Sequence, residues 1–90
     1  MEFAWDERKN RVNQRKHCIS FETAVLVFDD PHHLTTQDRD VESEARWRTI
    51  GMVNGLHVLL VAHTVSEDVI RIISARKATP RERSIYAQNN

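Results

Sequence analysis

The sequence lacks the residues that would build a disulfide framework, a cysteine-rich metal centre or a membrane span. Its 90 residues contain one cysteine, Cys18, which excludes an internal disulfide and a multi-cysteine zinc site and favours a reducing compartment. The longest apolar runs, residues 24–28 and 58–62, are far shorter than the ~20 residues that a membrane helix needs. Residues 1–3 do not resemble the start of a signal peptide. We therefore expect one cytoplasmic domain over residues 1–90 with no membrane contact.

Net charge is also absent, because 13 Lys and Arg balance 13 Asp and Glu, but the charges are segregated along the chain. Residues 1–21 carry five basic and three acidic side chains, residues 22–45 carry one and seven, and residues 46–90 carry seven and three. Two basic segments can converge on a polyanion while the acidic middle faces elsewhere or faces a basic partner. The alternative is that these charges are simply solvated.

Residues 69–78 have a β-branched and apolar core, which predicts a strand buried in the middle of a sheet. This segment carries Arg71, Arg76 and Lys77 without an acidic residue, so it is a scaffold for binding an anion. Strict alternation along a strand places Arg71 and Arg76 on opposite faces. The two arginines therefore meet one ligand only across a β-bulge or at the end of the strand.

The N-terminal third predicts an extended segment followed by two helices. Residues 2–6 form a short strand or an extended lead-in, and Asp6 caps a surface helix that runs from residue 7 to about residue 17 with one basic face. Ser20 caps a second helix that stops at residues 29–31 and packs an apolar face on the sheet, formed by Phe21, Ala24, Val25 and Phe28. Four candidate metal ligands cluster at the turn after this helix: Asp29, Asp30, His32 and His33. They lack the spacing of a closed metal site, so we expect no metal site here.

The remaining chain predicts most of a sheet and a last helix. Residues 34–36 form a possible edge strand, residues 37–45 a loop, and residues 46–53 and 56–64 two strands joined by a hairpin turn at Asn54-Gly55. A turn at residues 66–68 leads into residues 69–78, which gives three consecutive antiparallel strands. Thr79, Pro80 and Glu82 form a capping box that starts a short helix through Tyr86. The fold class is α+β, a small antiparallel sheet packed by two N-terminal helices with a short C-terminal helix.

A set of short motifs runs in order from Trp5 to Tyr86. The motifs are Trp5-Asp6-x-x-Lys9-x-x-x-Asn13-x-x-Lys16-His17, Ile19-Ser20-Phe21 with Ala24, Val27-Phe28-Asp29-Asp30-Pro31, Arg46 with Ile50-Gly51, Arg71-Ile72-Ile73-Ser74-Ala75-Arg76-Lys77-Ala78, and Glu82-Arg83 with Tyr86. Together they resemble the BrnT family of type II toxins over nearly the whole chain. This resemblance implies a fold similar to the RelE group and a ribonuclease that arrests translation by cleaving RNA. It also implies a cognate BrnA antitoxin, in a probable heterotetramer built on the antitoxin's DNA-binding dimer.

Two positions depart from the family pattern. Cys18 stands where family members usually carry glycine after the Lys-His pair, at a helix end that favours a left-handed residue, and this exchange costs of order 1 kcal/mol of stability. Ser66 stands where an arginine is common, two residues after the His63-Thr64 pair. If that arginine contributes to the site, this chain is a weakened or altered nuclease.

The chemistry that fits these residues is metal-independent RNA cleavage by attack of the ribose 2′-hydroxyl on the adjacent phosphorus, which needs cations, one acid and one base but no cofactor. Arg71 and Arg76 would hold the phosphate, because the planar guanidinium suits bidentate contacts. Protons or substrate orientation would fall to Lys9, His63 or Tyr86, with a solvated Lys9 and a structural His63 as alternatives. Further substrate contacts would come from Arg48, Lys77 and Arg81.

A second interpretation is an interaction module whose basic face only docks an acidic segment of the antitoxin. Under either interpretation, DNA binding belongs to the antitoxin, because this chain is neutral overall and shows no DNA-reading motif.

Overall fold

The computed structural model describes residues 1–41 and 44–89, which form one five-stranded sheet with three α-helices and a 3₁₀ segment. The strands lie in the order β1-β5-β4-β3-β2, and their bounds are β1 Glu2–Ala4, β2 Leu34–Val41, β3 Glu44–Val53, β4 His57–Ser66 and β5 Val69–Lys77. Only the β1–β5 pairing is parallel. The helical elements are α1 Glu7–His17, α2 Phe21–Ala24, the 3₁₀ segment η1 Val25–Asp29 and α3 Pro80–Gln88.

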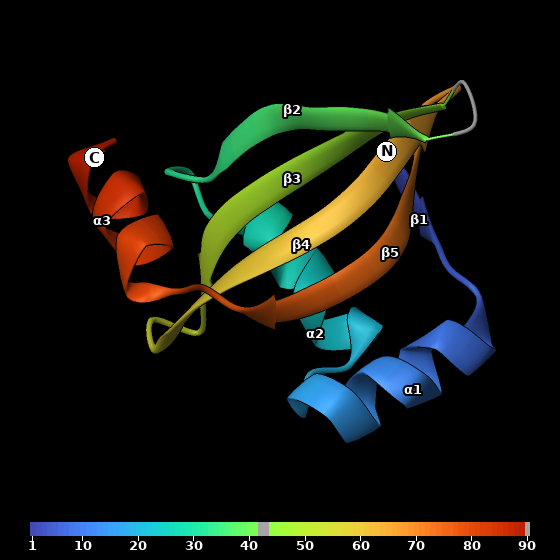
Figure 1. Cartoon of the computed structure of the whole chain (residues 1–90), viewed down its shortest axis with the longest axis horizontal. Coiled ribbons are helices and arrows are strands. Elements are labelled where there is room, and N and C mark those ends of the chain that lie inside the picture. The colour runs from blue at the N-terminus through green and yellow to red at the C-terminus, as the bar shows by residue number, and fades with distance from the viewer. Residues whose placement is uncertain (42–43, 90) are drawn as a thin grey trace.

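The helices lie on different sides of the sheet. Figure 1 looks onto the face that α2 leaves open, with α2 behind the strands, α1 below β5 and α3 beside one end of the sheet. Within residues 1–41 and 44–89, no helix is long and apolar enough to cross a membrane.

The main core lies between the helices and the rear face of the sheet. Three residues spaced three apart are completely buried: Phe21, Ala24 and Val27. They pack with apolar residues of three strands, Val53, Leu59, Val61, Ile70, Ile72 and Ala75. A smaller cluster on the front face joins Tyr86 of α3 to Ile50 and Leu60.

The second helix winds more tightly than expected. We predicted one apolar face containing Val25, but α2 ends at Ala24 and the chain continues as the 3₁₀ segment η1. A 3₁₀ helix has three residues per turn, so Val27 follows Phe21 and Ala24 into the fully buried core, while the predicted Val25 and Phe28 pack against it partly buried. Gly51 of β3 makes this close packing possible, because a Cβ atom there would lie 2.8 Å from the backbone oxygen of Val27.

The prediction of a loop over residues 37–45 is wrong for the residues that the structure describes. Residues 37–41 extend β2 and residues 44–45 begin β3, whereas residues 42–43 lie outside the described residues. The ladder runs from the Leu34–Ile50 pair to the Val41–Glu44 pair, with an irregularity between Gln37 and Asp40. An edge strand accommodates exposed charged side chains on its surface, so a polar composition did not require a loop here.

The other expected boundaries are confirmed to within a few residues. Asp6 caps α1 by accepting a hydrogen bond from the backbone N–H of Arg8 at 2.8 Å. The Asn54-Gly55 turn joins β3 to β4 with both residues at positive φ. Both hydrogen bonds of the capping box form between Thr79 and Glu82, and α3 continues two residues past Tyr86.

Two buried asparagines of α1 fix this helix to its surroundings. The Asn13 side chain donates to the backbone oxygens of Ile19 and Ala75 and accepts from the backbone N–H of Ala75. It therefore pairs with β5 as a neighbouring strand would, beyond the point where β1 ends. The side chain of Asn10 accepts from the backbone N–H of Phe21, which holds the start of α2 against α1.

Cys18 ends α1 in the left-handed conformation, with φ 59° and ψ 27°, as the family pattern of glycine at this position implies. A Cβ atom is unfavourable there, so Cys18→Gly should raise the free energy of unfolding by about 1 kcal/mol. Urea denaturation at pH 7 measures the difference. Cys18→Ala is the control, because it removes the thiol but keeps the Cβ atom. Equal stability of the glycine and alanine variants would contradict this account of the helix end.

Candidate functional site

A β-bulge in β5 brings Arg71 and Arg76 to the same face of the sheet. The register pairs Ala62 with Ser74 and His63 with Ile72, so Ile73 is an extra residue without a partner in β4. The extra residue resets the alternation of side chains. Arg71 and Arg76 therefore share the front face of the sheet, together with Ser74.

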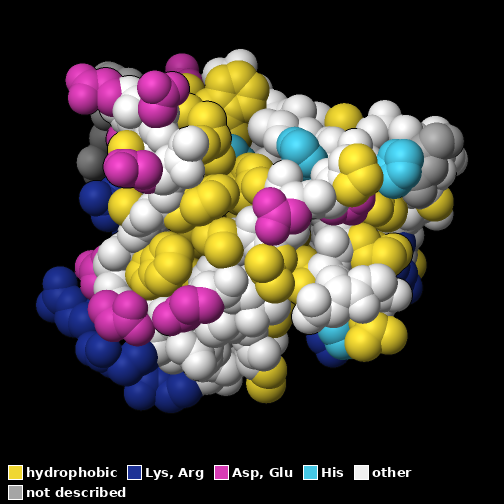
Figure 2. All heavy atoms as spheres, turned by 180° about the vertical axis from the view of Figure 1, so that it is seen from behind, with side chains coloured by type: hydrophobic (Ala, Val, Ile, Leu, Met, Phe, Trp, Pro, Cys, Tyr) yellow, Lys and Arg dark blue, Asp and Glu magenta, His cyan; other side chains and the backbone are white. Residues whose placement is uncertain are grey.

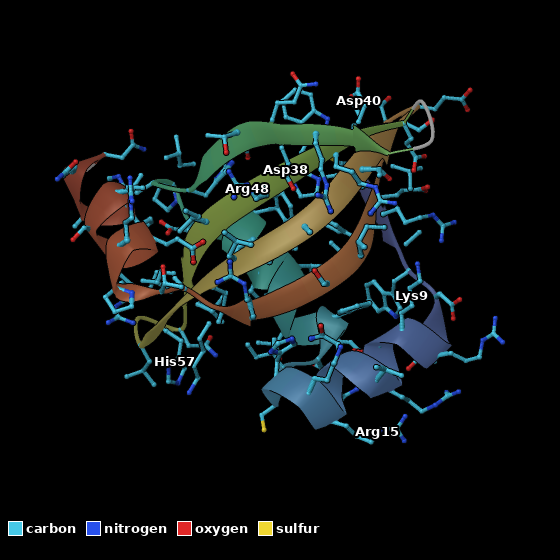
Figure 3. The ribbon with its side chains drawn as sticks, viewed as in Figure 1. Lys9, Arg15, Asp38, Asp40, Arg48 and His57 are labelled. Atoms are coloured by element: carbon cyan, nitrogen blue, oxygen red, sulfur yellow. The ribbon has the colours of Figure 1, made fainter. Side chains whose placement is uncertain are left out.

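The neighbouring strands add two more arginines to this face. Arg46 and Arg48 lie on β3 in the same alternation as Ile50, whose side chain belongs to the front cluster. Arg48 pairs with Ala62 of β4, and Ala62 pairs with Ser74 of β5, so small residues separate the arginines of β3 from those of β5. We call Arg46, Arg48, Arg71 and Arg76 the arginine face. Figure 3 shows Arg48 on the open side of the sheet.

Most of this positive charge lacks a full set of partners. The Nε atoms of Arg46 and Arg48 are buried and have no hydrogen-bond partner within the described part of the chain. Asp38 of β2 lies 3.9 Å from the Nε of Arg48, which is an ion-pair distance but too long for a hydrogen bond. Arg71 is exposed. The arginine face can therefore take up an anion, and phosphate suits the guanidinium geometry.

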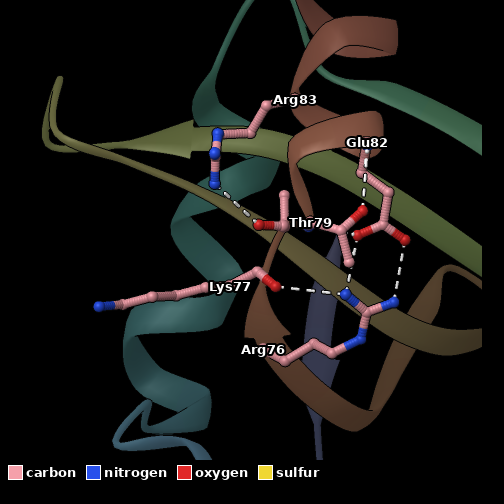
Figure 4. A network of polar contacts seen from close by, with 6 residues as sticks. Arg76, Lys77, Thr79, Glu82 and Arg83 are labelled. Carbon is pink, nitrogen blue, oxygen red and sulfur yellow. Dashed lines mark hydrogen bonds and ion pairs between the residues drawn. The ribbon is translucent and has the colours of Figure 1, made fainter.

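Arg76 differs because α3 already supplies it with a carboxylate. Its Nη1 and Nη2 atoms donate to the two carboxylate oxygens of Glu82 at 2.8 and 2.9 Å, as Figure 4 shows. The same Glu82 accepts from the backbone N–H of Thr79, so one side chain joins the helix cap to β5. The hydrogen bonds from Arg76 lower the pKa of Glu82 to about 2. In this conformation Arg76 holds α3 in place, which is a structural role.

Tyr86 also attaches α3 to the rest of the molecule. It is buried, and its hydroxyl donates to Oδ2 of Asp30. The same oxygen accepts a hydrogen bond from the backbone N–H of Met52. Burial and the adjacent Asp30 carboxylate raise the pKa of Tyr86 to about 12. The hydrogen bonds from Tyr86, Met52 and His32 outweigh burial and lower the pKa of Asp30. A tyrosine held in this way is a poor proton carrier near neutral pH.

His63 lies on the opposite side of the sheet from the arginine face. Its side chain is 1% exposed, its Nε2 atom lies 2.8 Å from the hydroxyl of Thr49, and its ring packs edge-on against Phe28. Burial lowers its pKa, so the neutral form is favoured. These contacts favour the structural alternative for His63 over substrate contact.

The other candidates lie in three separate places. Lys9 is exposed on α1 and lines a groove of about 400 Å³ that reaches Ser74 of the arginine-bearing strand. Lys77 lines a cavity on the rear side with Cys18. Arg81 of α3 and Arg48 line one cavity on the front side. Sequence reasoning did not single out Arg46 and Ser74 as candidates, although the structure places them on the same face as the other arginines. Strand alternation with Arg48 and with the segment 71–77 could have indicated them.

A second basic surface lies on α1. Figure 2, which views the molecule from behind, shows Lys and Arg side chains gathered over this helix. They belong to exposed residues of that helix, Arg8, Lys9, Arg11, Arg15 and Lys16. The molecule therefore has two separate basic surfaces, of which only the arginine face combines several strands. Among residues 1–41 and 44–89, no three Asp, Glu, His or Cys side chains are close enough together to hold a metal ion.

The fold and this site define a small α+β protein with four arginines on one face of its sheet. Residues 5–82 match the model of a family described as the ribonuclease toxin, BrnT, of type II toxin-antitoxin systems. The chain therefore belongs to the BrnT family. It is also similar to the crystal structure of the Brucella abortus ribonuclease toxin BrnT, with 26% sequence identity and a TM-score of 0.65 over 88% of this chain and 97% of that one. A comparison with curated proteins gives no match.

The resemblance found in the sequence is thus confirmed, and a toxin of this type acts with an antitoxin partner. The mixed α+β fold is confirmed as well. The similarity to the RelE group and the cytoplasmic location stay predictions.

The pairing of Arg76 with Glu82 gives stability a defined pH dependence. The pKa of Glu82 falls from its ordinary value of 4.5 to about 2 in the folded chain, so its stabilisation is present above pH 4.5 and is lost as the pH falls through 2. Glu82→Gln keeps a capping-box side chain but loses the ion pair, and it should cost about 1–2 kcal/mol at pH 7. Urea denaturation of both proteins at pH 7, 4 and 2 should show this difference shrinking towards pH 2. A difference that stays constant would contradict the ion-pair account.

Proposed function

We propose that this chain is an endoribonuclease toxin that cleaves RNA on its arginine face without a metal ion. The supporting observation is the convergence of four arginines from two strands on one face of the sheet, where β-sheet pairing holds them in fixed relative positions. Such preorganised cations stabilise charge that develops in a transition state. Membership of a family of ribonuclease toxins agrees with this activity.

The reaction proposed is attack of the ribose 2′-oxygen on the adjacent phosphorus. A bond forms between this oxygen and phosphorus, the bond from phosphorus to the 5′-oxygen breaks, and a 2′,3′-cyclic phosphate results. The 2′-hydroxyl gives up its proton and the leaving 5′-oxygen gains one. Negative charge increases on the non-bridging oxygens as the pentacoordinate phosphorane forms, and the guanidinium groups stabilise this charge.

The positions of the candidate residues in the structure decide which of them are best placed to contact the RNA. Arg71 is the strongest candidate for the phosphate, since it is exposed and is not engaged by Glu82. Arg46 and Arg48 would contact the neighbouring backbone. Lys9 is the proton donor or phosphate contact that we propose, because its groove reaches Ser74 at the edge of the arginine face. We assign Tyr86 and His63 to the support of the fold, given their buried hydrogen bonds.

We further propose that RNA cleavage arrests translation and that a BrnA-type antitoxin neutralises the toxin by covering the arginine face in a heterotetramer. Acidic or carboxylate-bearing antitoxin segments complement this face electrostatically, and salt should weaken their association. Simultaneous binding of RNA and antitoxin without competition would contradict this arrangement.

The proposed activity is tested by incubating RNA with the purified chain in EDTA. The wild-type chain should cut RNA, and Arg71→Lys should reduce the rate on the order of 10-fold or more while the melting temperature barely moves, because lysine keeps the charge but loses the two-pronged contact. Arg15→Lys on α1 is the matched control and should cut at the wild-type rate. Arg76→Lys should lower both activity and melting temperature, since it also disrupts the contact with Glu82.

Three results would count against this proposal. Intact RNA with the wild-type chain would favour the docking-only interpretation. Cleavage that EDTA abolishes would contradict the metal-free mechanism. An Arg71→Lys variant that loses stability and activity in parallel would assign Arg71 a structural role.

The alternative of a weakened toxin that mainly docks its antitoxin has one observation in its favour. Position 66 ends β4 in the same alternation as Ala62 and Thr64, so the arginine that is common there in the family would extend the arginine face. Ser66→Arg should therefore raise the cleavage rate on the order of 10-fold. Val65→Arg is the matched control, because it adds the same charge on the opposite face. Equal rates for the two variants would show that position 66 does not belong to the site.

A further inference from the structure

A cavity of about 450 Å³ lies beside the arginine face, between β2, β3 and α3. Its apolar lining includes Ile50, Leu60 and Ile85. Polar residues also line it, namely Arg48, Arg81 and Thr36, which pairs with Arg48. Because Arg48 belongs to both the cavity and the arginine face, an extended ligand can occupy the two at once.

The chemistry of this cavity matches a base rather than another phosphate. An apolar lining offers nothing to an anion, but it suits the flat face of an aromatic ring. Proteins that read single-stranded RNA place splayed bases against aromatic side chains or guanidinium planes and hydrogen-bond to the base edges. Arg48 and Arg81 supply such planes, and the volume lies within the range of small-molecule sites.

We propose that this cavity, the base pocket, holds one nucleobase of the RNA that is cut on the arginine face, and that Thr36, which pairs with Arg48 and shares its face, reads the edge of that base. The inference rests on the proposed function and adds a determinant of sequence preference to it. A threonine hydroxyl offers one donor and an acceptor, so it can hydrogen-bond to a complementary base edge.

Glu82 gives the base pocket a fixed acceptor. Its Oε1 accepts from Thr79 and from Arg76, whereas its Oε2 accepts only from Arg76 among the described residues. A carboxylate oxygen has about two acceptor positions, so one position on Oε2 remains for an N–H of the base. Since Arg76 holds the carboxylate by two hydrogen bonds, this acceptor cannot rotate away.

The test compares the cut sites of three proteins on one RNA of mixed sequence, mapped at single-nucleotide resolution. Thr36→Val should reduce the base preference at one position beside the cut by about 5–10-fold. Thr35→Val is the matched control, since Thr35 lies on the same strand, faces the other side of the sheet and does not line the base pocket. The control should keep the wild-type preference.

A Thr36→Val variant that cuts with the wild-type preference would overturn the base pocket and leave the proposed function intact. A wild-type chain that cuts no RNA would overturn the proposed function instead. The base pocket is then decided by titrating the labelled chain with each of the four nucleoside monophosphates and following its methyl resonances by NMR. Ring-current shifts confined to Ile50, Leu60 and Ile85 would support the pocket, and unchanged methyl resonances would overturn it.

Discussion

The single extra residue in β5 is the constraint on which the arginine face depends. Without Ile73 as a bulge, Arg71 and Arg76 would point to opposite faces, and one of them would enter the core behind the sheet. The bulge allows Ile70, Ile72 and Ala75 to stay in that core while both arginines face the front. A short strand thereby supplies apolar packing on one side and guanidinium groups on the other.

The attachment of α3 explains why two residues that look catalytic in the sequence have structural contacts. Arg76 and Tyr86 anchor α3 to the sheet and to the end of η1 through Glu82 and Asp30, respectively. These contacts use the charge-assisted hydrogen bonds that a phosphate would otherwise receive. They also form one side of the base pocket, because Glu82 faces that cavity while it is held by Arg76.

Local signals predicted most elements of the fold, and long-range contacts account for what they missed. Caps at Asp6 and Thr79 and the Asn54-Gly55 turn act within a few residues, so they were readable in the sequence. The extension of β2 depends on pairing with β3, and the pairing of Tyr86 with Asp30 spans 56 residues. Alternation alone left open whether Arg71 and Arg76 share a face, because a bulge has no signature in the spacing of apolar residues.

The central claim is that RNA binds the arginine face rather than the basic surface of α1. NMR spectra of the arginine side-chain Nε–H groups test it directly, with a 2′-O-methyl RNA oligonucleotide that cannot be cut. We predict that binding shifts the resonances of Arg46, Arg48 and Arg71 and leaves those of Arg11 and Arg15, which lie outside the Lys9 groove, in place. Shifts confined to Arg11 and Arg15 would contradict the claim.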